Sequence, residues 1–140
     1  MFGPIYLGTE KNTNTTYVVK QIVRYKLHPE DAASLDHEIS VLEALKDCKY
    51  VVPLHEIYED PDCTYIVIED YKGNSLINKL IEKTRFNEFG AKELVRNLLL
   101  GVDYCHKRRI ANRYLKLENL LLVSGSWSFS KMPFLKPPRF

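Results

Sequence analysis

The sequence has few cysteines, little net charge and no apolar run long enough to cross a bilayer. It also shows no secretory leader, so we expect an intracellular, cytoplasmic protein with no membrane partner. Its three cysteines, Cys48, Cys63 and Cys105, lie far apart without metal-ligand spacing, which favours inert thiols in a reducing compartment. With 20 basic and 18 acidic side chains, the composition gives no reason to expect a nucleic-acid partner.

The patterns that are present predict an α+β fold. Segments rich in Tyr, Val, Ile and Thr at 2–9 and 15–23 flank a turn-like run at 11–14, which indicates a β-hairpin. Apolar residues at helical spacing predict a helix from Pro29 to Lys46, and further strands are expected at 54–58 and 64–70. The chain then becomes helical, with a short helix capped by Ser75 and a longer one from Asn87 to about His106.

The longer helix is unusually apolar. Its main stripe consists of Leu94, Leu98, Val102 and Cys105. Val95 and Leu99 widen this stripe. A face this wide needs something to pack against, and left in water it favours aggregation. After Leu122 the pattern ends in a Ser-rich stretch and then three prolines, so we expect 123–140 to be irregular or disordered.

Residues 112–122 carry the most informative pattern, Asn-Arg-Tyr-Leu-Lys-Leu-Glu-Asn-Leu-Leu-Leu. This segment resembles the catalytic loop His-Arg-Asp-Leu-x-x-x-Asn of eukaryotic Ser/Thr protein kinases. In that family the Asp accepts the proton of the substrate hydroxyl and the Asn holds a Mg²⁺ ion. The resemblance therefore implies candidate catalytic positions at Tyr114, Lys116 and Asn119, with Asn119 also the candidate metal ligand.

The same segment departs from the family at the residue that matters most. Tyr114 occupies the position of the catalytic Asp, and a phenol with a pKa near 10 is protonated at neutral pH and cannot serve as that base. Losing a positioned base costs about 10²- to 10⁴-fold in rate. No Asp-Phe-Gly follows Leu122, so the usual second protein ligand of Mg²⁺ is missing too. We expect the chain as written to be catalytically inactive.

An earlier segment, Tyr17 to Lys20, resembles the kinase strand Val-Ala-Ile-Lys. In the family this Lys contacts the α- and β-phosphates of ATP and pairs with a Glu on the next helix, roles that fall to Lys20 and Glu38. The plainer interpretation is a lysine on a strand edge and an unrelated surface glutamate. We favour the functional interpretation because the segment at 112–122 accompanies it.

The run from Tyr65 to Leu76 resembles the strand and hinge at which kinases bind adenine. The resemblance makes Ile68 the residue beside the adenine pocket, gives the Glu69 carbonyl and the Tyr71 backbone to adenine, and places Ser75 near the ribose. It also implies an apolar sandwich around the ring formed by Ile5, Val18 and Leu121. The alternative is an ordinary buried strand leaving the core.

The resemblance covers residues 2 to about 122 and is strongest to the calcium/calmodulin-dependent group and related plant kinases. It implies a partial kinase domain at 1–122, with a small antiparallel sheet and one helix as the N-lobe at about 1–70. A hinge at about 69–75 and the first helices of the C-lobe at 75–122 would follow.

Three functions stay open. The first is a kinase-family chain whose ancestral activity, ATP- and Mg²⁺-dependent phosphoryl transfer to protein Ser/Thr, is lost. The second is a non-catalytic interaction module, a truncated pseudokinase that binds a nucleotide or competes for a kinase's partners. Its own partner would be a protein substrate or a partner kinase. The third is an unstable fragment of a gene product, which a flat thermal melt would reveal.

Overall fold

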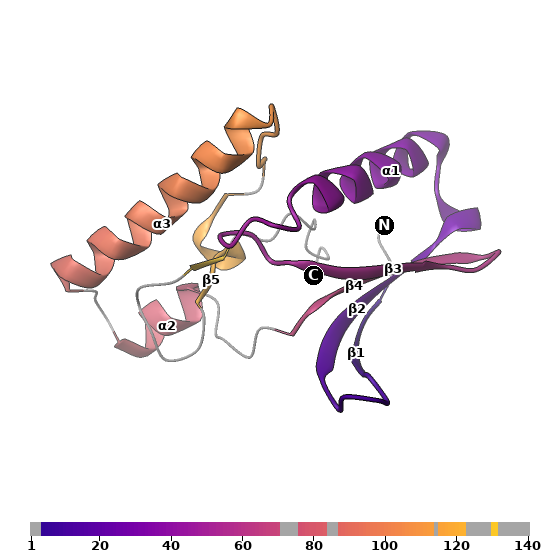
Figure 1. Cartoon of the computed structure of the whole chain (residues 1–140), viewed down its shortest axis with the longest axis horizontal. Helices are drawn as coiled ribbons and strands as arrows, with labels where there is room; N and C mark the ends of the chain where they lie inside the picture. The colour runs from indigo at the N-terminus through magenta and orange to yellow at the C-terminus, as the bar shows by residue number, and fades with distance from the viewer. Residues whose placement is uncertain (1–3, 71–75, 84–86, 114, 123–129, 132–140) are drawn as a thin grey trace. The chain divides into compact units, whose positions relative to one another are not determined.

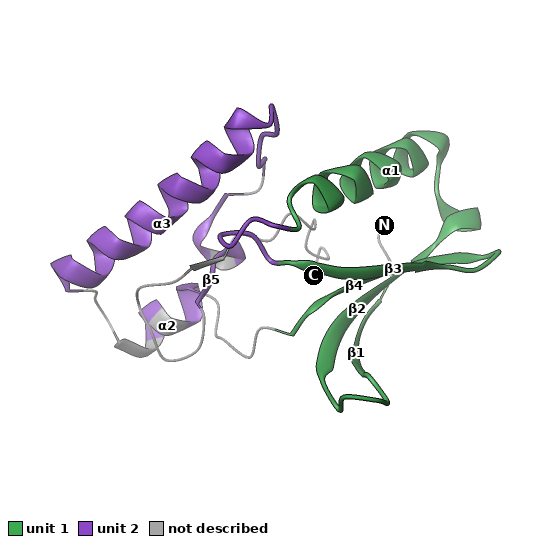
Figure 2. Ribbon diagram, in the orientation of Figure 1, with its two compact units in different colours: residues 1–46, 53–70, 137–140 green, residues 47–52, 71–136 purple. Residues whose placement is uncertain are grey.

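The computed structural model describes residues 4–70, 76–83, 87–113, 115–122 and 130–131. These residues form two compact units, coloured separately in Figure 2. The first contains the described parts of 1–46 and 53–70, and the second contains those of 47–52 and 71–136. Residues 47–52 therefore group with the helical unit. The domain bounds expected from the sequence stay a prediction.

The first unit is built on a four-stranded antiparallel sheet (Figure 1). Its strands are β1 (Ile5–Thr9), β2 (Thr16–Val23), β3 (Leu54–Glu59) and β4 (Cys63–Glu69), in the order β1-β2-β4-β3. At the turn between β1 and β2, Asn14 adopts a left-handed φ of 60°, which asparagine tolerates better than most residues. This tight turn lets the hairpin form where the sequence predicted it.

The helix α1 (Pro29–Ala44) covers one face of this sheet (Figure 1). Pro29 opens the helix, and Glu30 and Asp31 in the first turn complement its positive end. Leu35 and Leu42 are buried, as are Ile22 and Ile66 of the sheet. The helix ends two residues before the predicted Lys46, a small difference because the final turn is irregular at Leu45.

The turn from β3 to β4 is held by the carboxylate of Asp60. Its Oδ1 accepts hydrogen bonds from the backbone N–H groups of Asp62 at 2.8 Å and Cys63 at 2.7 Å. These two bonds, followed by one from the Tyr65 hydroxyl, keep the pKa of Asp60 below its usual value. A short 3₁₀ turn, η1 (Arg24–Lys26), which the sequence did not suggest, follows β2.

The second unit contains α2 (Leu76–Lys83), α3 (Glu88–Lys107), the 3₁₀ turn η2 (Leu117–Asn119) and the two-residue strands β5 (Leu121–Leu122) and β6 (Ser130–Lys131). The Asn87 side chain caps α3 by accepting a hydrogen bond of 2.7 Å from the Gly90 N–H. The predicted cap is thus observed, whereas Ser75, the expected cap of α2, lies outside the described residues.

The pairing of β5 with β6 differs from the irregular tail expected after Leu122. Leu121 pairs with Lys131 and Leu122 with Ser130, so the expectation is wrong at 130 and 131. Two paired residues leave no periodicity in a sequence, and the Ser-rich composition around them hides the strand. The remainder of 123–140 lies outside the described residues.

The helix α3 has two different sides. The side that packs within its unit is formed by Gly90, Leu94, Asn97, Gly101 and Cys105. Val95 and Leu99, predicted to widen the apolar stripe, are 48% and 60% exposed on the other side. Among the described residues no helix is long and apolar enough to cross a membrane.

Candidate active site

The clearest functional geometry in the first unit is an ion pair between β2 and α1. The Nζ atom of Lys20 lies 3.0 Å from Oε1 of Glu38, and the two side chains are 3% and 13% exposed. The sequence places Lys20 here because β2 directs alternate residues towards α1. Glu38 reaches it because it borders the helical stripe of Leu35 and Leu42.

Three of the expected apolar residues share the face of the sheet that carries Lys20. Ile5 pairs directly with Lys20, and Val18 lies two residues before it on the same strand. Ile68, on the neighbouring strand β4, pairs with Val18. Since cross-strand partners point to the same face, the sheet brings these side chains and Lys20 together.

Glu69 belongs to the opposite face, because it pairs with Tyr17 rather than with Val18. Its backbone N–H donates to the Pro53 carbonyl at 3.5 Å, a weak bond near the end of β4. The resemblance implies that the backbone carbonyl of Glu69 contacts adenine. The direction of the Glu69 side chain does not test this expectation. Tyr71 and Ser75, the other expected hinge residues, lie outside the described residues.

In the second unit, the segment that resembles the catalytic loop is folded around η2. The Asn119 N–H donates to the Lys116 carbonyl at 2.9 Å, which closes the turn. Asn119 is 8% exposed, while the Lys116 side chain is exposed. Tyr114 lies outside the described residues, so its expected effect on catalysis stays a prediction.

The residues after η2 anchor this segment to α2. The Leu120 carbonyl accepts a hydrogen bond of 2.8 Å from the Leu76 N–H. Leu120 and Leu122 are 3% and 4% exposed, and Leu121 between them is half-buried. The Leu-Leu-Leu run therefore alternates as a strand does. The hydrogen bond to Leu76 holds Asn119, the residue before Leu120, close to the start of α2. From the sequence, only the resemblance to kinases had pointed to Asn119.

A phosphate group and a metal ion need different side chains. An ammonium group held by a carboxylate, as in Lys20 with Glu38, suits phosphate oxygens. For a metal, Asn119 contributes an amide oxygen, but the described residues contain no group of three or more His, Cys, Asp or Glu side chains that could hold an ion. The described residues thus offer one buried cation, Lys20, for a phosphate group and one amide side chain, that of Asn119, for a metal.

The four-stranded sheet with α1, and the helices that follow it in the chain, are the elements of a protein kinase N-lobe and of the start of its C-lobe. A solved structure, "Crystal structure of Rad53 1-466 in complex with AMP-PNP", matches it with a TM-score of 0.76 and 26% identity, covering 95% of this chain and 34% of that one. The family model "Protein kinase domain" matches residues 1–131. The chain belongs to the protein kinase family, and the predicted α+β kinase-like fold is confirmed.

Similar curated proteins include calcium-dependent kinases, in line with the predicted resemblance. Calcium-dependent protein kinase 7 of Oryza sativa subsp. japonica is 37% identical over 123 residues, which are 87% of this chain and 23% of that protein. Myosin light chain kinase A of Dictyostelium discoideum is 33% identical over 123 residues, covering 88% of this chain and 41% of that protein. The chain spans about a quarter of the length of the first of these relatives.

Proposed function

We propose that this chain binds the phosphates of ATP through Lys20 and does not transfer them. The observation that carries the proposal is the ion pair of 3.0 Å between Lys20 and Glu38. The carboxylate fixes the ammonium in one place, so that a phosphate group meets a preoriented cation. The relative solved with a nucleotide analogue supports nucleotide binding by this fold.

ATP, when bound, would supply a phosphoryl group whose transfer needs a base and charge neutralisation. Lys20 contributes a positive charge, while Ile5, Val18 and Ile68 offer an apolar surface on the same face of the sheet. Asn119 is the single candidate metal ligand that the resemblance implies in the described part of 112–122. Because Tyr114 cannot act as the base and no Asp-Phe-Gly is present, the ancestral transfer to protein Ser/Thr stops at binding.

Nucleotide binding is tested by titrating the chain with a fluorescent ATP analogue. We expect saturable binding that Lys20→Met weakens at least about tenfold, because one charge-assisted contact contributes about 1.5–3 kcal/mol. Lys26→Met, on an exposed lysine of the same unit, is the matched control and should bind as the parent does. Equal binding by the Lys20→Met variant and the parent would exclude Lys20 as the phosphate contact.

Transfer is tested separately with radiolabelled ATP and a general protein substrate. We expect no incorporation above the level of the Lys20→Met variant. Turnover by the parent that disappears in Lys20→Met would overturn the proposed inactivity. It would leave the binding role of Lys20 standing, so the two halves of the proposal fail independently.

A second candidate function is a non-catalytic interaction module. The exposed apolar side of α3, with Val95 at 48% and Leu99 at 60%, favours it. Such a module would associate with a protein partner whether or not nucleotide is present. If the purified chain stays monomeric and no protein co-purifies with it, this candidate fails.

A further inference from the structure

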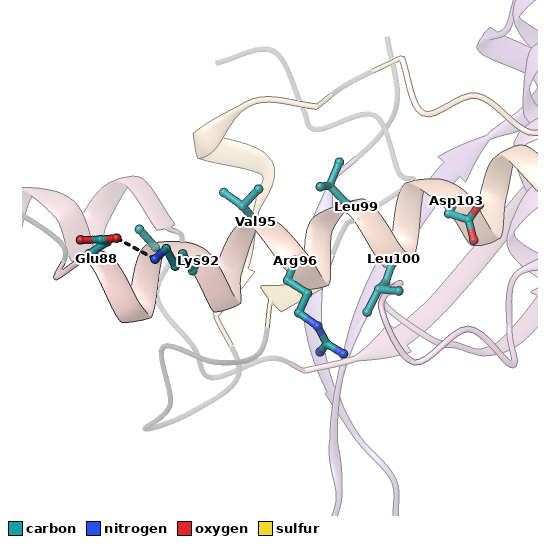
Figure 3. Close-up of a pocket in the computed structure, with 8 residues that line it drawn as sticks. Glu88, Lys92, Val95, Arg96, Leu99, Leu100 and Asp103 are labelled. Carbon is teal, nitrogen blue, oxygen red and sulfur yellow. Dashed lines mark ion pairs between the residues drawn. The ribbon is translucent and has the colours of Figure 1, made fainter.

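The exposed side of α3 forms a shallow groove bordered by charge. Val95 and Leu99 point to one side of it, and Arg96 and Leu100 to the other (Figure 3). This groove lies on the opposite side of the helix from Leu94 and Cys105, which are buried in the unit. A helix that is apolar on two sides has a second surface to cover.

The charges at the two ends of the groove follow a self-complementary order. At one end, Glu88 is paired with Lys92, with Oε1 and Nζ 2.6 Å apart. At the other, Asp103 is paired with Lys107 at 2.7 Å. Along the helix the stripe is acid, base, a centre of three aliphatic residues and Arg96, acid, base. All four charged side chains are more than half exposed and available to a second helix.

We propose that α3 packs antiparallel against α3 of a second copy of this chain. Reversing the stripe brings each acid level with a base: Lys92 lies opposite Asp103 of the second copy, and Glu88 comes level with Lys107 of the second copy. One register satisfies both contacts, because Glu88 precedes Lys92 by the same four residues that separate Asp103 from Lys107. The charges thus select both the direction and the register.

The same register closes the apolar centre. In an antiparallel pair related by a two-fold axis, each side of the groove meets the same side of the second copy. Val95 therefore meets Leu99 of the second copy on one side. On the other side Leu100 meets Arg96, whose methylene groups can cover a leucine while the guanidinium stays in water. A parallel pair in register would instead set Glu88 against Glu88 and Lys92 against Lys92, which is unfavourable. The antiparallel pair therefore has an advantage from both charge and apolar contact.

This dimer should be weak. A helix of 20 residues is about 30 Å long, so one helix pair buries less than the roughly 1,600 Å² of a standard interface. We expect dissociation in the micromolar range and a concentration-dependent mass. The dimer deepens the interaction-module candidate and does not depend on nucleotide binding, so its failure leaves the role of Lys20 untouched.

The first test is sedimentation velocity on the full 140-residue chain from about 5 to 500 µM, a range suited to a weak complex. We expect a monomer–dimer equilibrium that Leu99→Glu abolishes. Ile81→Glu, on an exposed aliphatic residue of α2, is the matched control and should dimerise like the parent. A parent that remains monomeric over the whole range, or a Leu99→Glu variant that dimerises unchanged, would overturn the proposal.

A charge swap tests the register. Lys92→Glu alone, or Asp103→Lys alone, places like charges opposite each other twice in the symmetric pair and should weaken dimerisation about tenfold. The double variant Lys92→Glu/Asp103→Lys should recover it. Both intrahelical repulsions, with Glu88 and with Lys107, persist in the double variant, so recovery cannot come from a repaired helix. Additive loss in the double variant would exclude this register.

Discussion

At the residue scale, the pair of Lys20 and Glu38 joins two side chains that differ in exposure. Lys20 is 3% exposed, whereas Glu38 is 13% exposed and lies nearer to water. Removing one member of a buried pair costs more when the charge left behind has no access to solvent. The ammonium of Lys20 therefore depends on Glu38 more than the carboxylate depends on Lys20.

This asymmetry predicts the order of stability of two variants. Glu38→Gln leaves a buried ammonium without its carboxylate and should lower the free energy of unfolding by on the order of 3 kcal/mol. Lys20→Met replaces the ammonium by an apolar side chain of similar length and should cost less than half as much. Urea denaturation followed by circular dichroism measures both. A larger loss for Lys20→Met would contradict the account.

Cys105 gives a second prediction at this scale. Burial, and to a smaller extent an electrostatic interaction with Cys48, raises the pKa of Cys105 from an ordinary value of 9.0 to about 11. Between these values the folded chain holds a proton that the unfolded chain has lost. The contribution of this thiol to stability is thus complete below pH 9 and is lost as the pH rises towards 11.

The Cys105→Ala variant isolates this effect from other groups that titrate at alkaline pH. We expect the difference in unfolding free energy between the parent and Cys105→Ala to shrink steadily from pH 9 to pH 11. Urea midpoints at intervals across this window provide the measurement. A difference that stays constant with pH would show that the thiol does not titrate as its burial implies.

At the element scale, the N-terminus of α3 depends on a single side chain. The Asn87 Oδ1 atom accepts from the Gly90 N–H at 2.7 Å and satisfies one of the free N–H groups of the first turn. Asn87→Ala should lower the free energy of unfolding by about 1 kcal/mol, while Asn87→Ser should retain most of it. Thermal melts of the three proteins test this, and equal losses for Ala and Ser would argue against a capping role.

The elements that the sequence predicted well are those with strong local patterns. The polar turn at 11–14 predicted the hairpin, and Asn87 with the repeating leucines predicted α3. The strands of 54–59 and 63–69 came within one residue of expectation, because β-branched and aromatic residues are bounded by the turn at Asp60. Local propensity and long-range packing agree in these segments.

The site was predictable to a lesser degree. The contact between Lys20 and Glu38 joins residues eighteen positions apart, and only the resemblance to a family predicted it. The strand β6 was missed because a strand of two residues carries no local signal in the sequence. The two-sided apolar character of α3 was visible in composition, but only the fold shows which side is packed.

At the scale of the whole molecule, restoring one residue should not restore activity. Tyr114→Asp returns a base to the segment at 112–122, but the 140 residues still contain no Asp-Phe-Gly to complete a metal site. We expect radiolabelled phosphate transfer by this variant to equal that of Tyr114→Asp/Lys20→Met. Transfer well above that double variant would show that the base was the only loss.

The strand order has a consequence for how the chain is made. The strand β4 lies between β2 and β3, and it is synthesised about 40 residues after β2. At about 5–20 residues per second, a ribosome leaves β2 with one open edge for about 2–8 s. A lone two-stranded hairpin is only marginally stable, and α1 emerges in this interval before its sheet is complete. During translation, β2 therefore has an edge that can pair with the wrong chain, although in the finished sheet it is an interior strand.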